Sequence, residues 1–275
     1  MKKVISIIIL CLACVCGLKA QNFWEFINHP ATLLGVSPEG SLFFYEGSNG
    51  ISRMQTANGA CTIVIGPETG FNFLFNSHCF CVSPEGRIFL FNNTLNAVMF
   101  SDDNGDTWQQ MPQVSSCAMD DVAGLYAPSN ETLVGWASTG EIFWTTDNGV
   151  TWDGAIPGFM NADNAPTIGD LLVNENGDVY IGISTIDINE GGGIYHLMLS
   201  DMQDGERVAG VGVNIRDMAF DPEGNVVACG YSGDGSSVGF QHIPGFYLFD
   251  GTSLAISNSG VVYKPTLAGH SAVLS

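Results

Sequence analysis

The chain has 275 residues, 45% of them hydrophobic, and its 28 acidic and 8 basic residues give a formal net charge of −20 at pH 7. Binding to nucleic acid depends on Lys and Arg displacing counterions from phosphates, so this charge balance excludes nucleic acid as a partner. The same charge opposes binding to anionic lipid surfaces. The length suits one large domain.

Residues 1–20 have the layout of a secretory signal peptide. Lys2 and Lys3 precede an apolar run over 4–18, and Ala20 is a small residue before the expected cleavage point. The run is shorter than the about 20 apolar residues that a membrane-spanning helix needs, so no integral membrane span is expected. A lipoprotein signal is the alternative, because cysteines lie in the run, but none follows a small-residue lipobox. We expect export to the periplasm, cell surface or medium, and a single domain over 21–275.

Five cysteines follow the signal, namely Cys61, Cys79, Cys81, Cys117 and Cys229. Their number is odd and no pair has the C-x-x-C spacing, so they do not form a dense disulfide framework. Cys79 and Cys81 alternate in an apolar stretch, which predicts two buried thiols on one side of a strand. The histidines show no metal-ligand spacing either, so neither a metal nor another cofactor is expected.

A strand–turn–strand unit recurs five times along the chain. The units occupy 33–45, 79–91, 124–136, 170–182 and 217–229. Their turn residues Gly40, Gly86, Asn130, Gly177 and Gly224 are 46, 44, 47 and 47 positions apart. Internal repetition at this period is typical of propellers and solenoids.

Each unit is predicted to be a β-hairpin followed by two further strands. Pro and Gly in the Ser-Pro-Glu-Gly turns at 37–40 and 83–86 fit a type I turn, and the flanking runs are rich in Val, Ile, Phe and Tyr. Third-strand candidates lie at 50–56, 96–101, 140–146, 192–199 and 245–250, and a fourth at 61–66. Four antiparallel strands per repeat form the blade of a β-propeller. We therefore predict an all-β propeller, with five blades favoured, six as the alternative and a truncated ring as the third.

An octapeptide figure occurs twice, as SDDNGDTW at 101–108 and TTDNGVTW at 145–152. Its aspartates can accept backbone N–H bonds inside a turn, its glycines can take positive φ, and its tryptophans can pack on the blade. The octapeptides are therefore predicted to be structural turns. A calcium site is the alternative, but the octapeptides lack the spacing of oxygen ligands found in an EF-hand loop. The residues that define the two copies are Ser101, Asp103, Gly105, Thr107 and Trp108, and Thr145, Asp147, Gly149, Thr151 and Trp152.

The pattern Ser/Thr-x-Asp-x-Gly-x-Thr-Trp resembles the Asp-box, or BNR repeat. Residues 33–255 are similar to exported BNR-repeat and photosystem-assembly-factor-like propellers, a resemblance that implies the fold but no particular activity. Sialidases of this kind bind a carboxylate with three arginines, one of them in an Arg-Ile-Pro motif. After the signal this chain has only Arg53, Arg87, Arg207 and Arg216, none in that motif, so sialidase activity is not expected.

Two classes of function are left for the chain. The first is a non-catalytic binding or scaffold module for a glycan or an envelope or extracellular protein, with Trp24, Trp136 and Trp144 as candidate contacts because aromatic faces stack on sugars. Packing between blades is the alternative role for each tryptophan. The second is a glycoside hydrolase or lyase with a carboxylate pair at the propeller mouth, for which Asp120 with Asp121 and Asp187 with Glu190 are candidates. The module is our main hypothesis, without catalytic residues.

Overall fold

The computed structural model describes residues 31–55, 59–66, 77–112, 122–161, 166–185, 192–209, 213–220, 224, 226–232, 245–249 and 254–257. The expected signal peptide, Trp24, Cys117 and the candidate pairs Asp120–Asp121 and Asp187–Glu190 lie outside these residues. Among the described residues, no helix is long and apolar enough to cross a membrane.

The described strands form five antiparallel sheets of four strands, each with its strands in chain order. Blade 1 contains β1 (Thr32–Val36), β2 (Leu42–Tyr45), β3 (Ile51–Met54) and β4 (Cys61–Ile65). Blade 2 contains β5 (Phe80–Val82), β6 (Ile88–Asn92), β7 (Ala97–Ser101) and β8 (Gln109–Gln110). Blade 3 contains β9 (Val122–Tyr126), β10 (Leu133–Ala137), β11 (Ile142–Thr145) and β12 (Asp153–Ala155).

Blade 4 contains β13 (Thr167–Val173), β14 (Asp178–Ser184), β15 (Gly193–Met198) and β16 (Asp201–Ala209). Blade 5 contains β17 (Val213–Phe220), β18 (Val226–Ser232), β19 (Gly245–Phe249) and β20 (Leu254–Ser257). The helices of the described part are short 3-10 turns, namely η2 (Gly47–Asn49), η4 (Ser77–Cys79) and η5 (Gly158–Asn161). The predicted all-β propeller of four-stranded blades is confirmed.

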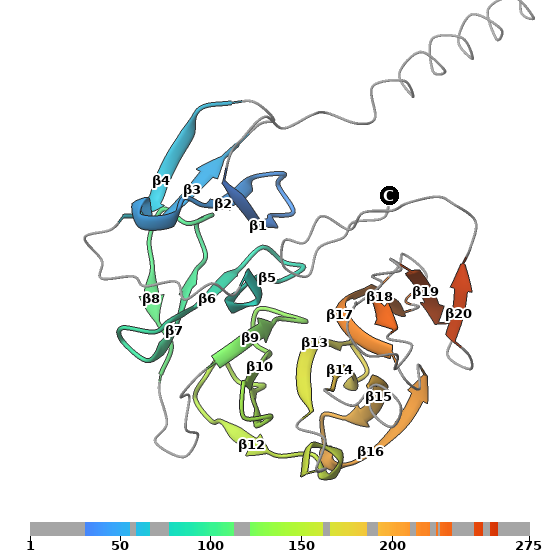
Figure 1. Ribbon diagram of the computed structural model, residues 1–275. Coiled ribbons are helices and arrows are strands. Elements are labelled where there is room, and N and C mark those ends of the chain that lie inside the picture. The colour runs from blue at the N-terminus through green and yellow to red at the C-terminus, as the bar shows by residue number, and fades with distance from the viewer. Residues whose placement is uncertain are drawn as a thin grey trace, which may run out of the picture.

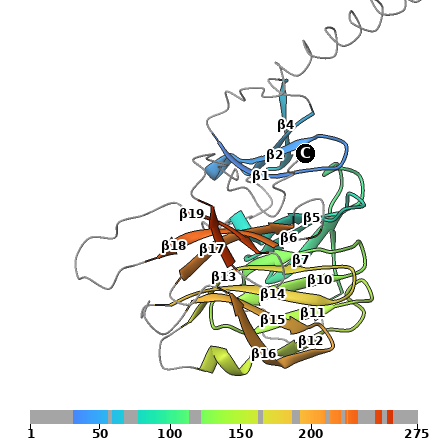
Figure 2. The same cartoon turned by 90° about the vertical axis from the view of Figure 1, so that its right-hand side faces the viewer.

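The sheets follow one another around an arc, with blade 1 and blade 5 at its two ends (Figure 1). The first strands of consecutive blades touch, β1 with β5, β5 with β9, β9 with β13 and β13 with β17. Because these strands contact one another, the first strand of every blade lies on the inner side of the arc. In the side view, blade 1 lies at the opposite end of the molecule from β16 (Figure 2).

The hairpin between the first two strands is closed by the predicted turn. In blade 1, Gly40 N donates to Ser37 O at 2.8 Å, and Gly40 has φ +86°. A type I turn followed by a left-handed residue is a common hairpin loop, and glycine takes that conformation without steric cost. Blade 3 differs, because Asn130 is outside the positive-φ set and instead its side chain accepts bonds from Ser83 and Arg87 of blade 2. The fourth-position turn residue of this repeat thus joins two blades.

Aromatic side chains fill the spaces between the sheets. Phe43 of blade 1, Phe80 and Phe89 of blade 2 and Phe143 of blade 3 are fully buried in one cluster. The ring centroids of Phe43 and Phe80 are 5.5 Å apart. Burying such a side chain contributes about 1.5–3 kcal/mol, so each inter-blade layer is a substantial part of the core. Apolar residues on both faces of the strands thus serve packing between neighbouring blades.

Candidate functional site

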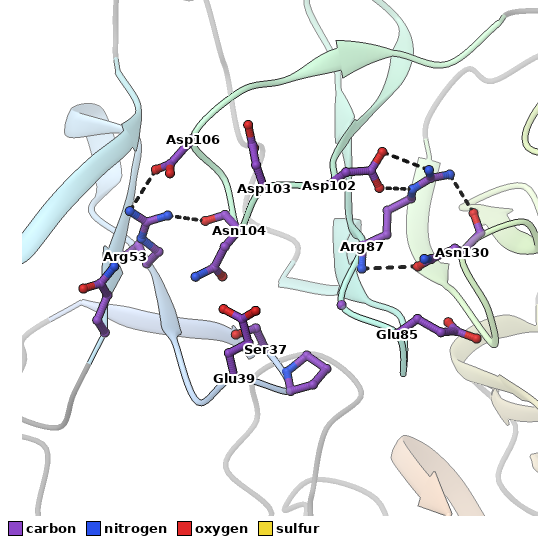
Figure 3. A pocket seen from close by; sticks show the side chains of 13 residues that line it. Ser37, Glu39, Arg53, Glu85, Arg87, Asp102, Asp103, Asn104, Asp106 and Asn130 are labelled. Atoms are coloured by element: carbon purple, nitrogen blue, oxygen red, sulfur yellow. Dashed lines mark hydrogen bonds and ion pairs between the residues drawn. The ribbon is translucent and has the colours of Figure 1, made fainter.

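A polar cleft of about 440 Å³ opens where the turns of blades 1, 2 and 3 meet (Figure 3). Blade 1 contributes its β1–β2 turn and the end of β3. Blade 2 contributes its β5–β6 turn and the first octapeptide turn, and blade 3 contributes Asn130. The lining residues are Ser37, Pro38, Glu39, Arg53, Gln55, Glu85, Gly86, Arg87, Asp102, Asp103, Asn104, Asp106 and Asn130.

Arg87 forms one wall of the cleft and is held by its own blade and by blade 3. Its Nε and Nη2 bind the two carboxylate oxygens of Asp102 at 2.6 and 2.9 Å. Its Nη1 donates to the carbonyl oxygen of Asn130 at 2.8 Å and to Oδ1 of Asn148 at 2.6 Å. The two-pronged contact with Asp102 has the geometry in which arginine binds carboxylates most strongly. Arg87 therefore connects blade 2 to blade 3.

Arg53 makes the corresponding contact between blades 1 and 2. Its Nη2 lies 2.9 Å from the Asp106 carboxylate, and its Nη1 donates to the carbonyl oxygen of Asn104 at 2.5 Å. The Arg53 side chain is only 8% exposed. A buried guanidinium needs such partners because an uncompensated charge is costly away from water. Both arginines that line the cleft are thus neutralised by aspartates.

The cleft carries an excess of negative charge. Five lining carboxylates, those of Glu39, Glu85, Asp102, Asp103 and Asp106, face two guanidinium groups, so the balance is 2 − 5 = −3. Glu39 and Glu85 occupy the third positions of the two Ser-Pro-Glu-Gly turns, and both are exposed. The site can therefore accept hydrogen bonds from hydroxyl, amide or ammonium groups, whereas an anion would be repelled.

The first octapeptide turn borders this cleft and is closed by its own side chains. Asp103 accepts a bond from Thr107 N at 2.7 Å through Oδ1 and one from Thr107 Oγ1 at 2.6 Å through Oδ2. Ser101 Oγ donates to Asp103 Oδ1 at 2.8 Å and accepts from Gly105 N at 2.8 Å. Trp108 Nε1 donates to the carbonyl oxygen of Gly105 at 3.1 Å. Each of the five residues that define the octapeptide pattern therefore has a hydrogen-bond partner within the turn.

The second octapeptide turn repeats the bonds of the aspartate and of the first hydroxyl residue. Asp147 accepts from Thr151 N at 2.8 Å and from Thr151 Oγ1 at 2.7 Å, and Thr145 Oγ1 accepts from Gly149 N at 2.9 Å. Trp152 Nε1 donates to the carbonyl oxygen of Pro112 in blade 2 at 3.1 Å. In these contacts the side chains stabilise the turn and dock it on the preceding blade.

Hydrogen bonds fix the ionisation state of the octapeptide aspartates. The side-chain and backbone bonds from Thr107 lower the pKa of Asp103 to about 2. The equivalent bonds from Thr151 lower the pKa of Asp147. Bonds donated to the ionised form have this effect. Both groups are carboxylates over the physiological range, and a general acid requires the opposite shift.

The candidate tryptophans differ in their surroundings. Trp136 is 1% exposed in the core between blades 3 and 4, which corrects its assignment as a ligand contact, because no face of its ring is open. Its burial follows from the missing side chain at Gly124, where a Cβ would lie 2.0 Å from the Trp136 ring. Trp144 is half-buried against the same cluster. Neither lines the polar cleft, and Trp24 lies outside the described residues.

The inner strands carry a second group of polar side chains. Asp170 of β13 is fully buried, and its carboxyl accepts the N–H of Met218, the residue after Asp217 on β17. His78 Nδ1, from η4, lies 3.9 Å from Asp170 Oδ1, and burial lowers the pKa of His78. Asp170 itself is closed off from solvent, so its carboxyl is not accessible to a ligand.

Both thiols of blade 2 are buried, with Cys79 at the end of η4 and Cys81 in the inner strand β5. Cys79 Sγ donates to the carbonyl oxygen of Val122 in blade 3 at 3.3 Å. Burial raises the pKa of Cys79 to about 12 and that of Cys81 further. A thiol with so high a pKa is inert as a nucleophile. Among the residues that the structure describes, no group of three or more His, Cys, Asp or Glu side chains could hold a metal ion.

Sequence reasoning missed both the cleft and the Asp170–Asp217 pair, although the repeats contained a signal for each. Asn precedes Gly in both octapeptides, at 104 and 148, and these asparagines contact the arginine of the preceding blade. Asp170 and Asp217 each lie seven residues before a turn glycine, at Gly177 and Gly224. Equal positions in repeats become neighbours when blades pack side by side, so both pairs could have been read from the alignment of the repeats.

The fold defines the chain as a β-propeller protein, and its solved structural neighbours belong to the same class. Virginiamycin B lyase from Staphylococcus aureus is 12% identical, with a TM-score of 0.56 over 90% of this chain and 75% of the lyase. The GH74 xyloglucanase from Xanthomonas campestris is also 12% identical, with a TM-score of 0.53 over 83% of this chain and 38% of the xyloglucanase. These identities establish a common fold only.

A structure of YCF48 bound to a D1 peptide is 14% identical, with a TM-score of 0.49 over 82% of this chain. The chain spans 66% of that YCF48 chain, just under two thirds of its length. No protein-family model and no curated protein matches the sequence. The neighbours thus include enzymes as well as a protein that binds a peptide.

Proposed function

We propose that the chain is an exported, non-catalytic β-propeller of the Asp-box kind that binds a glycan or an envelope protein through the cleft of blades 1 to 3. The observation that carries the proposal is the cleft itself, which gathers side chains from three blades at one end of the sheets. Side chains on rigid elements and tight turns are suited to hold a ligand in one orientation.

The polarity of the cleft favours a hydroxyl-rich or cationic ligand. Glu39 and Glu85 are exposed and lie on adjacent turns, where a Cβ on Gly86 would be 3.7 Å from the Pro38 ring. In Figure 3, Glu39 lies below Asn104 and Glu85 lies below Arg87 and Asn130. Carboxylates bind sugar hydroxyls and amines as acceptors, and charged acceptors form the stronger hydrogen bonds. Neutral and amino sugars, or the basic side chains of a protein, meet this requirement.

The remaining carboxylates of the cleft support binding rather than catalysis. Asp102 is paired with Arg87, Asp106 with Arg53, and Asp103 is held ionised by Thr107. Glycoside hydrolysis needs one carboxyl that donates a proton and a second that acts as base or nucleophile. Carboxylates tied to structural partners are poor candidates for these roles. The carbohydrate-active enzyme is therefore the competing outcome of the test below.

Glutamine variants test the site. We expect the wild-type protein to bind neutral or amino saccharides on a glycan array, and the double variant Glu39→Gln, Glu85→Gln to bind at least about tenfold more weakly, since two charged acceptors are lost. Glu175→Gln is the matched control, because Glu175 is exposed in the equivalent turn of blade 4 and does not line the cleft. Equal binding by the double variant, or binding confined to acidic saccharides, would contradict the proposal.

Protein partners are tested with the same three proteins. If the array gives no saccharide, cross-linking to envelope extracts should yield a partner that the wild type and Glu175→Gln capture and the double variant does not. A partner captured equally by all three would place the binding surface outside the cleft.

A further inference from the structure

Two aspartates meet at the junction between the inner strands of blades 4 and 5. Asp170 is 0% exposed and Asp217 is 9% exposed. Asp170 Oδ1 accepts a hydrogen bond from Leu171 N at 2.8 Å, and Oδ2 accepts one from Met218 N in blade 5 at 2.6 Å. Asp217 directly precedes Met218, so the two carboxyl groups lie side by side at this junction. The Asp170 side chain therefore bonds its own strand and the next blade together.

A hydrogen bond between two carboxyl groups requires a proton, because an ionised carboxyl is only an acceptor. The titratable neighbours of the pair are His78 of η4 and Tyr126 of β9, while Arg216, next to Asp217 in β17, is exposed. Burial lowers the pKa of His78, so its imidazole is neutral at pH 7. Tyr126 is neutral too, since burial and then the nearby Asp170 raise its pKa. His78 and Tyr126 therefore supply no positive charge to replace the shared proton.

The surroundings act on both acids in the same direction. Burial, followed by the charge of Asp217, raises the pKa of Asp170 well above its usual range. Burial also raises the pKa of Asp217. Like charges at hydrogen-bonding distance cannot both be ionised without a large energetic cost, as in the paired carboxyls of acid proteases. The pair is best described as one unit that retains one proton.

The pair is specific to one junction. The same repeat position, seven residues before the turn residue, is occupied by Leu33, Cys79 and Ala123 in blades 1 to 3. In blade 2, Cys79 makes the inter-blade contact with a neutral thiol. Packing of this propeller therefore does not require carboxyl groups at the position, and their presence adds a property that the other junctions lack.

We propose that Asp170 and Asp217 form a proton-dependent contact between blades 4 and 5, in which one shared proton joins β13 to β17 and its loss at higher pH weakens this junction. The contact makes the packing of blade 5 against blade 4 sensitive to the pH of the compartment in which the protein works. It is independent of the ligand that the cleft binds.

The sign of the effect follows from the direction of the pKa changes. The acids of the unfolded chain ionise near their ordinary pKa of about 3.9, below the raised pKa of the folded pair. The folded protein then binds more protons than the unfolded chain between these values. The stabilisation by the contact is complete in acid and is lost as the pH rises through the folded pKa. Each proton changes the unfolding constant by up to about tenfold per pH unit.

Two asparagine variants distinguish the shared proton from ordinary packing. In Asp217→Asn, the amide N–H can donate to Asp170 in place of the shared proton, so the contact persists without repulsion between two carboxylates, and only burial still acts on the pKa of Asp170. In Asp170→Asn, an amide nitrogen replaces an oxygen that accepts a backbone N–H, so two donors face each other and the protein is destabilised. Asp201→Asn is the control at an exposed position of β16.

The test is urea unfolding of the full chain between pH 5 and 9, together with infrared spectra of the protonated carboxyl band at pH 7. We expect the unfolding constants of the wild type and Asp201→Asn to rise with pH relative to that of Asp217→Asn, by up to about tenfold per pH unit near the folded pKa. We also expect the band in both of these proteins and a weaker band in Asp217→Asn, where burial alone favours the neutral carboxyl of Asp170. Equal pH dependence in the wild type and Asp217→Asn, or an equally strong band in the two proteins, would overturn the proposal. Asp217→Asn decides the matter even if Asp170→Asn does not fold.

Discussion

The asparagine before the glycine of each octapeptide turn has two roles. Asn104 and Asn148 have φ of +58° and +61°, and the glycine that follows each of them also has a positive φ. Asparagine tolerates this region better than most residues with a side chain. Asn104 Nδ2 also donates to Ser41 Oγ of blade 1 at 2.8 Å, and Asn148 Oδ1 accepts from Arg87 of blade 2. One residue thus shapes the turn and binds the preceding blade.

Substitution at Asn104 should separate these roles. Asn104→Ala places a Cβ-bearing residue with no compensating side-chain bond in the left-handed region and removes the bond to Ser41, for an expected loss of about 2 kcal/mol of stability. Asn104→Gly should lose less, because only the bond is removed. Urea unfolding at pH 7 measures both variants. Wild-type stability in Asn104→Ala would show that neither role contributes.

The acidity of Asp103 gives a second prediction at this scale. Because bonds from Thr107 lower its pKa to about 2, Asp103 should remain ionised in the folded protein well below the ordinary pKa of about 3.9. Its contribution to stability is present above the ordinary pKa and is lost as the pH falls through about 2. Carboxyl chemical shifts followed by NMR should show this midpoint, whereas exposed Asp153 serves as the comparison. A midpoint for Asp103 near 4 would contradict the hydrogen bonding described here.

At the scale of the element, arginines join successive blades on the face that carries the cleft. Arg53 and Arg87 each reach from one blade to the octapeptide turn of the next. Arg87 also lies over the ring of Phe100, with its guanidinium carbon 4.6 Å from the centroid. The planar guanidinium serves several carbonyl and carboxylate acceptors at once, which an ammonium group cannot do.

Arg87→Lys should therefore destabilise the protein although it keeps the charge. We expect a loss of about 1–2 kcal/mol, less than for a fully buried pair, because Asp102 is 49% exposed and water screens part of the interaction. Arg207→Lys is the control, since Arg207 is exposed on β16. Thermal unfolding of the two variants side by side provides the measurement. Similar melting temperatures would mean that the fork-shaped contact does not stabilise the blades.

The blades could be predicted from the sequence, whereas the repeats indicated only single contacts of the cleft and not the cleft itself. The spacing of Gly40, Gly86, Gly177 and Gly224 is a property of the chain, and a repeat of this period has few architectures open to it. The cleft arises from side chains of three blades, and its arginines lie in segments that look like ordinary strand and turn. The role of Trp136 could not be decided from the sequence for a related reason. Its burial, which favours packing over ligand contact, depends on Gly124 in the neighbouring strand.

At the scale of the whole molecule, the arrangement of the blades separates two polar regions. The cleft lies at the turns of blades 1 to 3, and the Asp170–Asp217 pair lies between the inner strands of blades 4 and 5. One region is open to a ligand and the other is closed to solvent. Binding and the response to pH are therefore proposed for different parts of the arc.

Export of the molecule has a simple consequence. If residues 1–20 are a signal peptide, the protein recovered from the periplasm or medium after expression in a bacterial host should begin at Gln21. Intact-mass measurement of the secreted protein checks the cleavage point. A protein that retains Met1 in the cytoplasm would contradict export, and a lipid-modified cysteine at the N-terminus would support the lipoprotein alternative.

The central claim is that the cleft binds its ligand without transforming it. The most direct test is to incubate the wild-type protein with each saccharide that it binds on the array and to measure the mass of the recovered saccharide. The account predicts an unchanged mass after prolonged incubation, with binding that depends on Glu39 and Glu85. A cleaved or eliminated product that forms with the wild type and not with the Glu39→Gln, Glu85→Gln variant would show that the cleft is an active site.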